Sequence, residues 1–373
     1  MTSGSPMRLR IVGIRAARWS MSVVEDHWEY AAGVVTALGG LVVVVTDEDG
    51  HEGYGYSAAN AFGPETLDSV VGAFDCIGRA KGWRNLMLHD ARARWDRLVH
   101  GSPQAKAGLE LALIDLIGRR ASMPAHEVLG HDADQKRTGV TRILALDEPD
   151  AMAARARELI LDGATGLKIK AEGNLTVDGR RVRDVRQAVG DEVRLVVDAN
   201  GTYAPKRAIL LGAILDECDV EVFEQPVAPG NIEGLREVRT ATRCMVEADE
   251  SAATITDVLH LAQHRAVDSI SIKLPKMGGL LSSLRIARLC RDLGLEFRLG
   301  AHFNSRMYES ACAHLLACVP SDMPHELGEP EHLGPDPYDR SFIIDGQLVL
   351  PDGPGLGVVP HPAVPDDGWQ YQW

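Results

Sequence analysis

Five short motifs between residues 166 and 276 decide how this sequence folds. Each has an apolar or β-branched lead-in, which predicts a buried strand, and each ends in charged residues. The motifs are, in order, Gly166-Leu-Lys-Ile-Lys170, Val196-Val-Asp-Ala-Asn200, Val222-Phe-Glu-Gln-Pro226, Val246-Glu-Ala-Asp-Glu250 and Ser271-Ile-Lys-Leu-Pro-Lys276. Because a buried strand rarely contains a charge without a use for it, we expect these charges to be functional.

The charged residues recur at the spacing of one strand–helix unit. From Lys170, the steps to Asp198, Glu224, Asp249 and Lys273 are 28, 26, 25 and 24 residues. A (β/α)₈ barrel uses about 25 to 35 residues per unit and gathers the C-terminal ends of its strands on one face. Three carboxylates would meet there, and close carboxylates repel one another unless a cation lies between them. All-oxygen ligands favour Mg²⁺, with Mn²⁺ as the second choice.

The order of the motifs resembles the enolase superfamily, in its muconate lactonizing enzyme subgroup. The resemblance rests on Lys-x-Lys at 168–170, Asp-x-Asn at 198–200, Glu-Gln-Pro at 224–226, Ala-Asp-Glu-Ser at 248–251 and Lys-x-x-Lys-x-Gly-Gly at 273–279, and it covers nearly the whole chain. It implies a modified (β/α)₇β barrel, TIM-like, with an N-terminal α+β capping domain that the C-terminal tail completes. It also implies Mg²⁺-assisted removal of an α-proton through an enediolate, with Lys or His as the base.

The rest of the chain fits this layout. We expect residues 1–135 to form the cap together with the tail 336–373, and residues 136–335 to form the barrel. Barrel strands are expected near 139–146, 166–171, 193–198, 220–225, 244–249, 269–274, 295–301 and 324–328, with an irregular eighth unit. In the cap, 9–17 and 34–47 are predicted strands, 65–100 and 104–119 are predicted helical, and 18–33 and the segment from Gly53 are predicted loops.

Composition limits the possible partners. The net charge of −14 disfavours nucleic acid and anionic membranes, and no apolar run approaches the length of a membrane-spanning helix. The six cysteines show no paired spacing, which predicts reduced thiols in the cytoplasm. The expected partner is a small-molecule carboxylate substrate, and the family resemblance implies a homo-oligomer between dimer and octamer.

Asp198, Glu224 and Asp249 are the predicted metal ligands, although each alone could instead cap the helix that follows it. Lys168 and Lys170 are two apart on a strand and therefore face the same side. Two ammonium groups this close lower each other's pKa, and a neutral amine near physiological pH can act as a general base. By the resemblance, Lys170 is the acid/base and Lys168 tunes it or contacts substrate; a pair that only balances the carboxylates is the alternative.

Lys273 falls across the barrel from Lys170, and bases on both faces of a planar intermediate are the arrangement for racemisation. In the family's cycloisomerases, one lysine is thought to do the acid/base work while the other is electrostatic, so the same residues also fit that reaction. The predicted substrate-binding residues come from strand ends and from the cap loops; they are Asn200, His302, Glu326, Trp28 and Tyr56. For His302, a hydrogen-bonded loop histidine is an equal alternative. Gly278-Gly279 is a turn at the start of a helix that could cradle an anionic group.

The favoured reaction is racemisation or epimerisation of an amino-acid-type carboxylate. A muconate-type cycloisomerase and an acid dehydratase are the alternatives on the same scaffold. The absence of an Asp-x-Asp pattern after strand eight counts against a dipeptide epimerase. Alternatives outside this chemistry are a catalytically silent barrel and a metal-dependent hydrolase, although the latter usually relies on histidine-rich ligand sets.

Overall fold

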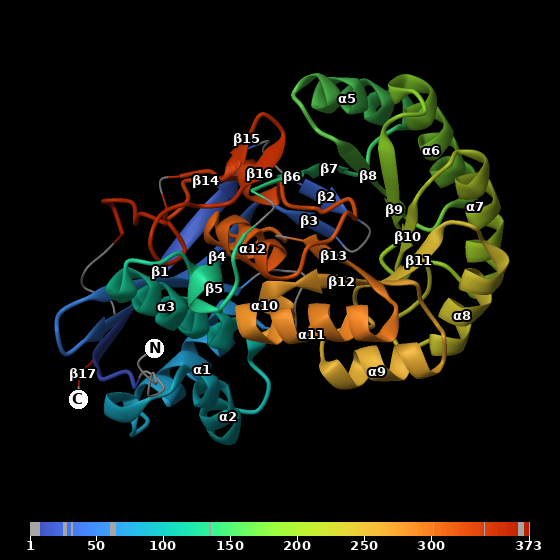
Figure 1. The fold of residues 1–373 in the computed structure, drawn as a ribbon. Coiled ribbons are helices and arrows are strands. Elements are labelled where there is room, and N and C mark those ends of the chain that lie inside the picture. Colours follow the sequence, from blue (N-terminus) through green and yellow to red (C-terminus); the bar gives the residue numbers. More distant parts are fainter. Residues whose placement is uncertain are drawn as a thin grey trace.

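A computed structural model of the chain describes residues 8–24, 28–30, 33–59, 65–133, 136–300, 302–338, 340–364 and 369–372. It contains a cap built on an antiparallel sheet and a barrel built on a parallel sheet (Figure 1). No helix in this part of the chain is long and apolar enough to cross a bilayer.

The cap sheet is covered by helices on one face and by the barrel on the other (Figure 1). Its main path runs β14-β1-β4-β5, with bounds β1 (Ile11–Val23), β4 (Ala37–Asp47), β5 (Glu52–Ala59) and β14 (Leu333–Gly334). The helices are α1 (Leu67–Gly78), α2 (Leu88–Leu98) and α3 (Pro103–Ala121). Leu41, Val43 and Val45 pack with the helices, whereas Val42 packs on the barrel side. Because both faces are covered, this run of β4 is apolar throughout.

The segment from Gly53 to Tyr56 was predicted to be a loop, but it lies inside strand β5. The glycines reflect close packing rather than a turn, because α3 crosses directly over them. A Cβ on Gly53 would lie 2.2 Å from the Ala112 carbonyl oxygen, and one on Gly55 would lie 1.9 Å from the Gly108 carbonyl oxygen. Phe62, in the same predicted loop, lies outside the described residues.

The predicted loop 18–33 is also largely strand. β1 continues to Val23, and the alternation of exposed Ser20 and Ser22 with buried Met21 and Val23 is the period-two pattern of a strand with one covered face. Beyond it, β2 (Trp28–Tyr30) pairs with β3 (Gly33–Val35), while His27 lies outside the described residues.

The barrel sheet has seven parallel strands in the order β13-β12-β11-β10-β9-β8-β7. Their bounds are β7 (Thr141–Leu144), β8 (Gly166–Lys170), β9 (Arg194–Asp198), β10 (Val222–Glu224), β11 (Met245–Ala248), β12 (Ser269–Lys273) and β13 (Glu296–Gly300). The eighth position is irregular, as predicted. Glu326 forms isolated parallel bridges with both Thr141 and Gly300, so this segment lies between the two edge strands of the sheet.

Helices surround the outside of the barrel (Figure 1). They are α5 (Pro149–Leu161), α6 (Leu175–Val189), α7 (Pro205–Glu217), α8 (Ile232–Ala241), α9 (Ile255–Gln263), α11 (Leu280–Leu293) and α12 (Met307–Cys318). Local sequence fixes several starts: α5 and α7 begin at a proline, and Thr254 with Asp257 forms a capping box at α9. These amphipathic helices bury their apolar faces against strands that are buried on both sides.

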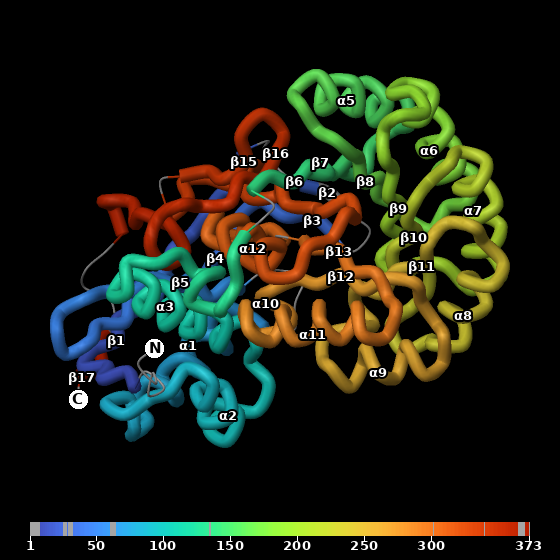
Figure 2. The backbone as a smooth tube through the Cα atoms, viewed as in Figure 1, coloured from blue at the N-terminus to red at the C-terminus, as the bar shows by residue number. Residues whose placement is uncertain are grey.

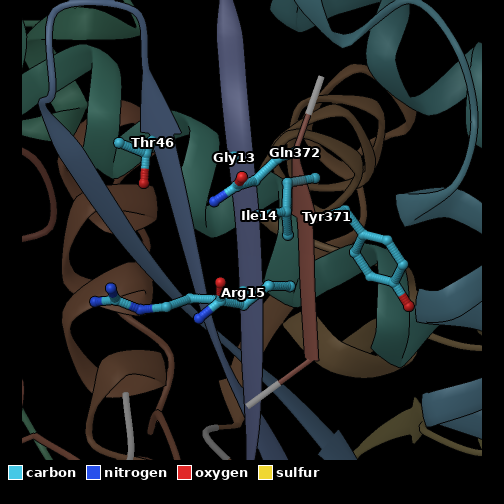
Figure 3. A pocket seen from close by; sticks show the side chains of 7 residues that line it. Gly13, Ile14, Arg15, Thr46, Tyr371 and Gln372 are labelled. Carbon is cyan, nitrogen blue, oxygen red and sulfur yellow. The ribbon is translucent and has the colours of Figure 1, made fainter. Parts of the chain in front are cut away.

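The C-terminal tail returns to the cap, as predicted, and Figure 2 shows its red segments running among the blue N-terminal strands. β15 (Ile343–Ile344) and β16 (Gln347–Val349) form a small sheet with β6 (Arg137–Gly139). β17 (Trp369–Gln372) pairs antiparallel with residues 13–16 of β1, where Tyr371 lies beside Ile14 (Figure 3). The tail therefore adds a strand to the cap sheet.

Candidate active site at the C-terminal end of the barrel

The strand register brings the predicted site residues to one level of the barrel. Lys170 pairs with Asp198, and Asp198 pairs with Glu224 on the next strand. Asp249 follows the end of β11, and Lys273 ends β12. All are at least nine-tenths buried. The spacing in the sequence therefore predicted a real juxtaposition of carboxylates and lysines.

The residues at this level form a row across neighbouring strands, in the order Lys170, Asp198, Glu224, Asp249 and Lys273. The lysines form ion pairs along the row. Lys168 Nζ lies 3.0 Å from Asp198 Oδ2 and 2.9 Å from Glu224 Oε2, and it also contacts Glu326. Lys170 Nζ donates to Asp198 Oδ2 at 2.7 Å. At the far end, Lys273 Nζ lies 2.5 Å from Asp249 Oδ2. Each predicted metal ligand is thus paired with at least one ammonium group.

The pKa values of Lys168 and Lys273 are raised, whereas the sequence predicted that neighbouring lysines would lower each other's pKa. Burial alone would lower the pKa of Lys168, but the charges of Asp198, Glu224 and Glu326 outweigh burial and raise it well above its ordinary value. For Lys273, the carboxylate of Asp249 likewise outweighs burial and raises the pKa. The expectation that paired lysines depress one another is wrong for Lys168 in these contacts, because it touches carboxylates directly.

Among the three predicted metal ligands, Glu224 is the one with a buried oxygen that has no hydrogen-bond partner in the described part of the chain. Burial, followed by the charge of Asp198, raises the pKa of Glu224 to about 8. Its Oε1 atom is buried and has no hydrogen-bond partner among the described residues, while Lys273 Nζ lies 3.9 Å away. A buried acceptor left without a donor costs about 1–3 kcal/mol. An oxygen ligand set containing such an atom fits a hard divalent cation.

A second acidic group lies far from this row in the sequence, at the turn between β4 and β5. Asp47, Asp49 and His51 are the one group in the described ranges whose ligand atoms all lie within 4.8 Å of one another. Asp47 Oδ1 already accepts the backbone N–H groups of Asp49 and His51, and Arg120 contacts both aspartates. These contacts account for the group as a stabilised turn. The oxygens of Asp198, Glu224 and Asp249 are spread more widely, with Lys168 and Lys273 bridging between them.

Three of the predicted substrate-binding residues border the row. Asn200 adopts a left-handed backbone (φ 43°), accepts from Lys170 at 3.3 Å and donates to Glu250 at 3.1 Å. His302, after β13, is also left-handed (φ 63°), and burial together with the charge of Lys273 holds its pKa well below its ordinary value. Glu326 pairs with Lys168, and the positive charges of Lys168 and Lys273 outweigh burial and lower its pKa to about 2. Left-handed non-glycine residues at strand ends are a form of strain typical of functional sites.

The two aromatic candidates from the cap have different surroundings. The Trp28 ring lies 4.9 Å from the ring of Phe303 and 4.7 Å from that of His332, so it covers the segment after β13. Tyr56 is only 1% exposed and packs in the apolar core. A Cβ on Gly40 would lie 2.3 Å from its ring, which shows how tightly Tyr56 is enclosed. Trp28 therefore lies next to the loop that follows β13, whereas the side chain of Tyr56 is enclosed in the core.

Three further residues of the site were not predicted from the sequence; they are Arg298, Glu247 and Gln225. Arg298, on β13, is 1% exposed, donates to Glu247 at 2.7 Å and contacts Glu224. Gln225 (φ 37°) accepts the backbone N–H of Asp249 at 3.1 Å and so links β10 to the segment after β11. The signal for Arg298 and Glu247 was present, since each is a charge inside a short apolar strand.

These features define an α/β barrel whose strand ends carry a row of buried carboxylates and lysines. Residues 151–364 match the family described as enolase C-terminal domain-like, and residues 18–130 match the mandelate racemase / muconate lactonizing enzyme N-terminal domain. The chain belongs to the mandelate racemase/muconate lactonizing enzyme group of the enolase superfamily.

Its relatives are isomerases. The hydrophobic dipeptide epimerase of Enterococcus faecalis is 30% identical over 357 residues, which cover 94% of this chain and 99% of that protein. The L-Ala-D/L-Glu epimerase of Clostridium acetobutylicum is 32% identical over 336 residues (87% and 92%), and a chloromuconate cycloisomerase of Pseudomonas putida is 31% identical over 279 residues (73% and 74%). The structure of an Enterococcus faecalis dipeptide epimerase complexed with Mg and L-Leu-L-Tyr superposes with a TM-score of 0.88 at 28% identity, covering 95% of this chain and 100% of that one. The chain is accordingly an isomerase of this superfamily.

Proposed function

We propose that this enzyme is a Mg²⁺-dependent racemase or epimerase that acts at the α-carbon of an amino-acid-type carboxylate. The observation that carries the proposal is the placement of Lys170 and Lys273 at opposite ends of one carboxylate row, beside Asp198 and Asp249 respectively. Substrate held between them would present one face to each amine. Acid/base groups on both faces of the carbon are the arrangement for inversion by two bases.

The ion would be held by Asp198, Glu224 and Asp249. The unpartnered Oε1 atom of Glu224 supports this assignment, as does the Mg in the structure of the related Enterococcus faecalis epimerase. When bound, the ion supplies positive charge that stabilises the negative charge developing on the substrate carboxylate.

The chain's own residues would carry the proton. The neutral amine of one lysine accepts the α-proton as the C–H bond breaks, which leaves an enediolate. The ammonium group of the other lysine then donates a proton to the opposite face, and the product has the inverted configuration. Lys168 places a further positive charge beside Asp198 and Glu224, and neutral His302 lies near Lys273 as a hydrogen-bonding partner for substrate.

Trp28 would close this space from the cap side. Its ring packs against Phe303, in the segment that follows β13, and is buried there. A closed apolar cover excludes water and strengthens the electrostatic interactions beneath it. Asn200, which joins Lys170 to Glu250, would hold the amine in place on the other side.

A muconate-type cycloisomerase is the second candidate. The observation that favours it is the 31% identity to a chloromuconate cycloisomerase, and that reaction can use the same lysines and carboxylates. Only the fate of the intermediate differs, so the row of charges does not separate the two reactions.

Incubation of the enzyme with Mg²⁺ and enantiopure substrates tests the proposal. The panel should contain N-acyl amino acids, proline derivatives, dipeptides and cis,cis-muconate. Dipeptides are included because two of the relatives epimerise them, although residues 326–331 read Glu-Leu-Gly-Glu-Pro-Glu rather than Asp-x-Asp. A change in optical rotation with an amino-acid derivative is the expected result. Loss of diene absorbance from muconate, with no change in any amino-acid derivative, would favour the cycloisomerase.

A further inference from the structure

The turn that follows Lys273 is short and closely constrained. Lys273 ends β12 and leads directly into α10 (Leu274–Met277), a helix of one turn. Gly278 (φ 85°) and Gly279 (φ 127°) then connect α10 to α11, and the Gly279 N–H donates to the Leu274 carbonyl at 2.9 Å. A shift of this turn would therefore reach Lys273 through a single helical turn.

Two side chains of the cap hold this turn. Arg92, on α2, donates to the Gly278 carbonyl at 2.9 Å and to Ser282 Oγ at 3.2 Å. Glu110, on α3, accepts the backbone N–H of Leu281 at 2.8 Å. Glu110 is 2% exposed, so the contact lies wholly inside the junction between cap and barrel.

The two glycines suit this turn, since both have a positive φ that other residues rarely adopt and both approach these cap side chains closely. A Cβ on Gly278 would lie 2.3 Å from Arg92 Nη1, and a Cβ on Gly279 would lie 2.2 Å from Glu110 Oε1. The turn was predicted to be able to cradle an anionic group, and in the structure that place is filled by the carboxylate of Glu110. Partnering the free N–H groups of a helix start with a carboxylate is favourable both for hydrogen bonding and for the helix dipole.

Glu110 is also an unusual group to bury. Burial raises its pKa to about 7, against the opposing effects of the N–H groups of Leu281 and Leu280 and the charge of Arg92. A carboxylate so costly to bury marks a junction that specifies one geometry rather than merely adding apolar area.

We propose that Glu110 and Arg92 are positioning residues that set the place of Lys273 through the Gly278–Gly279 turn. The cap would then contribute to the barrel's chemistry by fixing one of its two opposing lysines. Among the described residues Lys170 has no such link, since it ends β8 and is hydrogen-bonded within the barrel to Asp198 and Asn200. The inference rests on the proposed function only where it treats Lys273 as an acid/base. The link from Glu110 and Arg92 to Lys273 can be tested without substrate.

Competitive acetylation with acetic anhydride, read residue by residue by mass spectrometry, tests the link on the intact protein. Lys170 and Lys273 are similarly buried, so Lys170 serves as the internal control. In Glu110→Ala, we expect the acetylation rate of Lys273 to rise several-fold while that of Lys170 stays unchanged. Glu110→Gln keeps an oxygen acceptor and should restore the wild-type rate.

Glu65→Ala is the matched control. Glu65 is another buried carboxylate that accepts a helix-start N–H, that of Gln104 at 2.9 Å, but it lies within the cap. The Glu65→Ala substitution should leave the acetylation rates of Lys170 and Lys273 unchanged. Arg92→Ala, at a more exposed residue, provides a second variant if Glu110→Ala does not fold, with the same expected rise at Lys273.

In Glu110→Ala, equal changes in the acetylation rates of Lys170 and Lys273, or no change in either rate, would overturn the inference whatever the activity of the enzyme. Failure of the wild type to racemise any substrate would instead contradict the proposed function and leave the labelling result to stand by itself. Where activity is present, Glu110→Ala should slow α-proton exchange from one enantiomer more than from the other, on the order of tenfold or more. Equal slowing of both enantiomers would overturn the positioning role.

Discussion

Lys170 and Lys273 face the same row of carboxylates from opposite ends, one 2.7 Å from Asp198 and the other 2.5 Å from Asp249. Glu224 lies between them because β10 lies between β9 and β11 in the sheet. The row thus has a buried carboxylate at its centre, where we propose that the cation binds, and an amine at either end.

Glu224→Gln should weaken Mg²⁺ binding by about tenfold or more, which is about 1.4 kcal/mol or more of binding free energy. The reason is that the amide removes the charge of the proposed ligand whose Oε1 atom has no hydrogen-bond partner among the described residues. Isothermal titration with Mg²⁺, supported by Mn²⁺ electron paramagnetic resonance, measures the change.

Asp49→Asn is the control for that experiment, because Asp49 belongs to the separate acidic group at the β4–β5 turn. Its substitution should leave Mg²⁺ affinity unchanged. Weakened binding in Asp49→Asn, with normal binding in Glu224→Gln, would move the ion to the turn and refute the assignment of ligands.

Arg298→Met should destabilise the protein by about 3–5 kcal/mol, because it leaves Glu247 buried without its cation and removes one of the cations that contact Glu224. Urea unfolding measures the loss. Arg155→Met provides the contrast: Arg155 pairs with Glu158 on an exposed helix face, and its loss should cost at most about 0.5 kcal/mol. Similar small losses in both variants would show that the Arg298 cluster is not a buried ion-pair network.

The free energy of unfolding should fall in mild acid, because His314 can take up a proton in the unfolded chain but not in the folded protein. Burial, followed by the proximity of His126, lowers the pKa of His314 to about 3, so the folded protein keeps it neutral. The unfolded chain takes up that proton below about pH 6.5, so this contribution to stability is complete above that pH and is lost as the pH falls toward 3. Between pH 6.5 and 5.0 the loss is about 1.5 kcal/mol.

His314→Gln should therefore show a shallower pH dependence of the unfolding free energy than the wild type over that range. His260→Gln, at an exposed histidine of α9, should keep the wild-type slope. An unchanged slope in His314→Gln would show that this histidine does not stay neutral in the fold.

Much of the barrel site could be predicted because it is encoded by spacing. Equal steps between strand ends become neighbouring positions in a parallel sheet, so Lys170, Asp198 and Glu224 had to meet. The direction in which the pKa of Lys168 shifts could not be predicted in the same way, because it depends on which carboxylates of the neighbouring strands contact the amine. Nor could the contact of Glu110 with Leu281, which joins residues distant in sequence through the docking of two separate cores.

The cap was predicted less accurately for a related reason. Gly53 and Gly55 have the composition of a turn, and only the crossing of α3 shows that they are strand residues at a close approach. Tyr56 is predicted to bind substrate, and the structure adds that it lies on strand β5 with its side chain buried. Patterns within a strand can be read locally, whereas packing between layers cannot.

The most direct measurement is α-proton exchange by NMR in D₂O with Mg²⁺, starting separately from each enantiomer of the N-acyl amino acids, proline derivatives, dipeptides and sugar acids. Wild-type enzyme should exchange and invert both enantiomers of its substrate, and chelation of the metal should abolish both. Lys170→Ala and Lys273→Ala should each lose exchange from one enantiomer by about 10²–10⁴-fold, with opposite preferences, while exchange from the other enantiomer persists. Loss of exchange from the same enantiomer in both variants, or exchange that survives the loss of both lysines, would contradict the account.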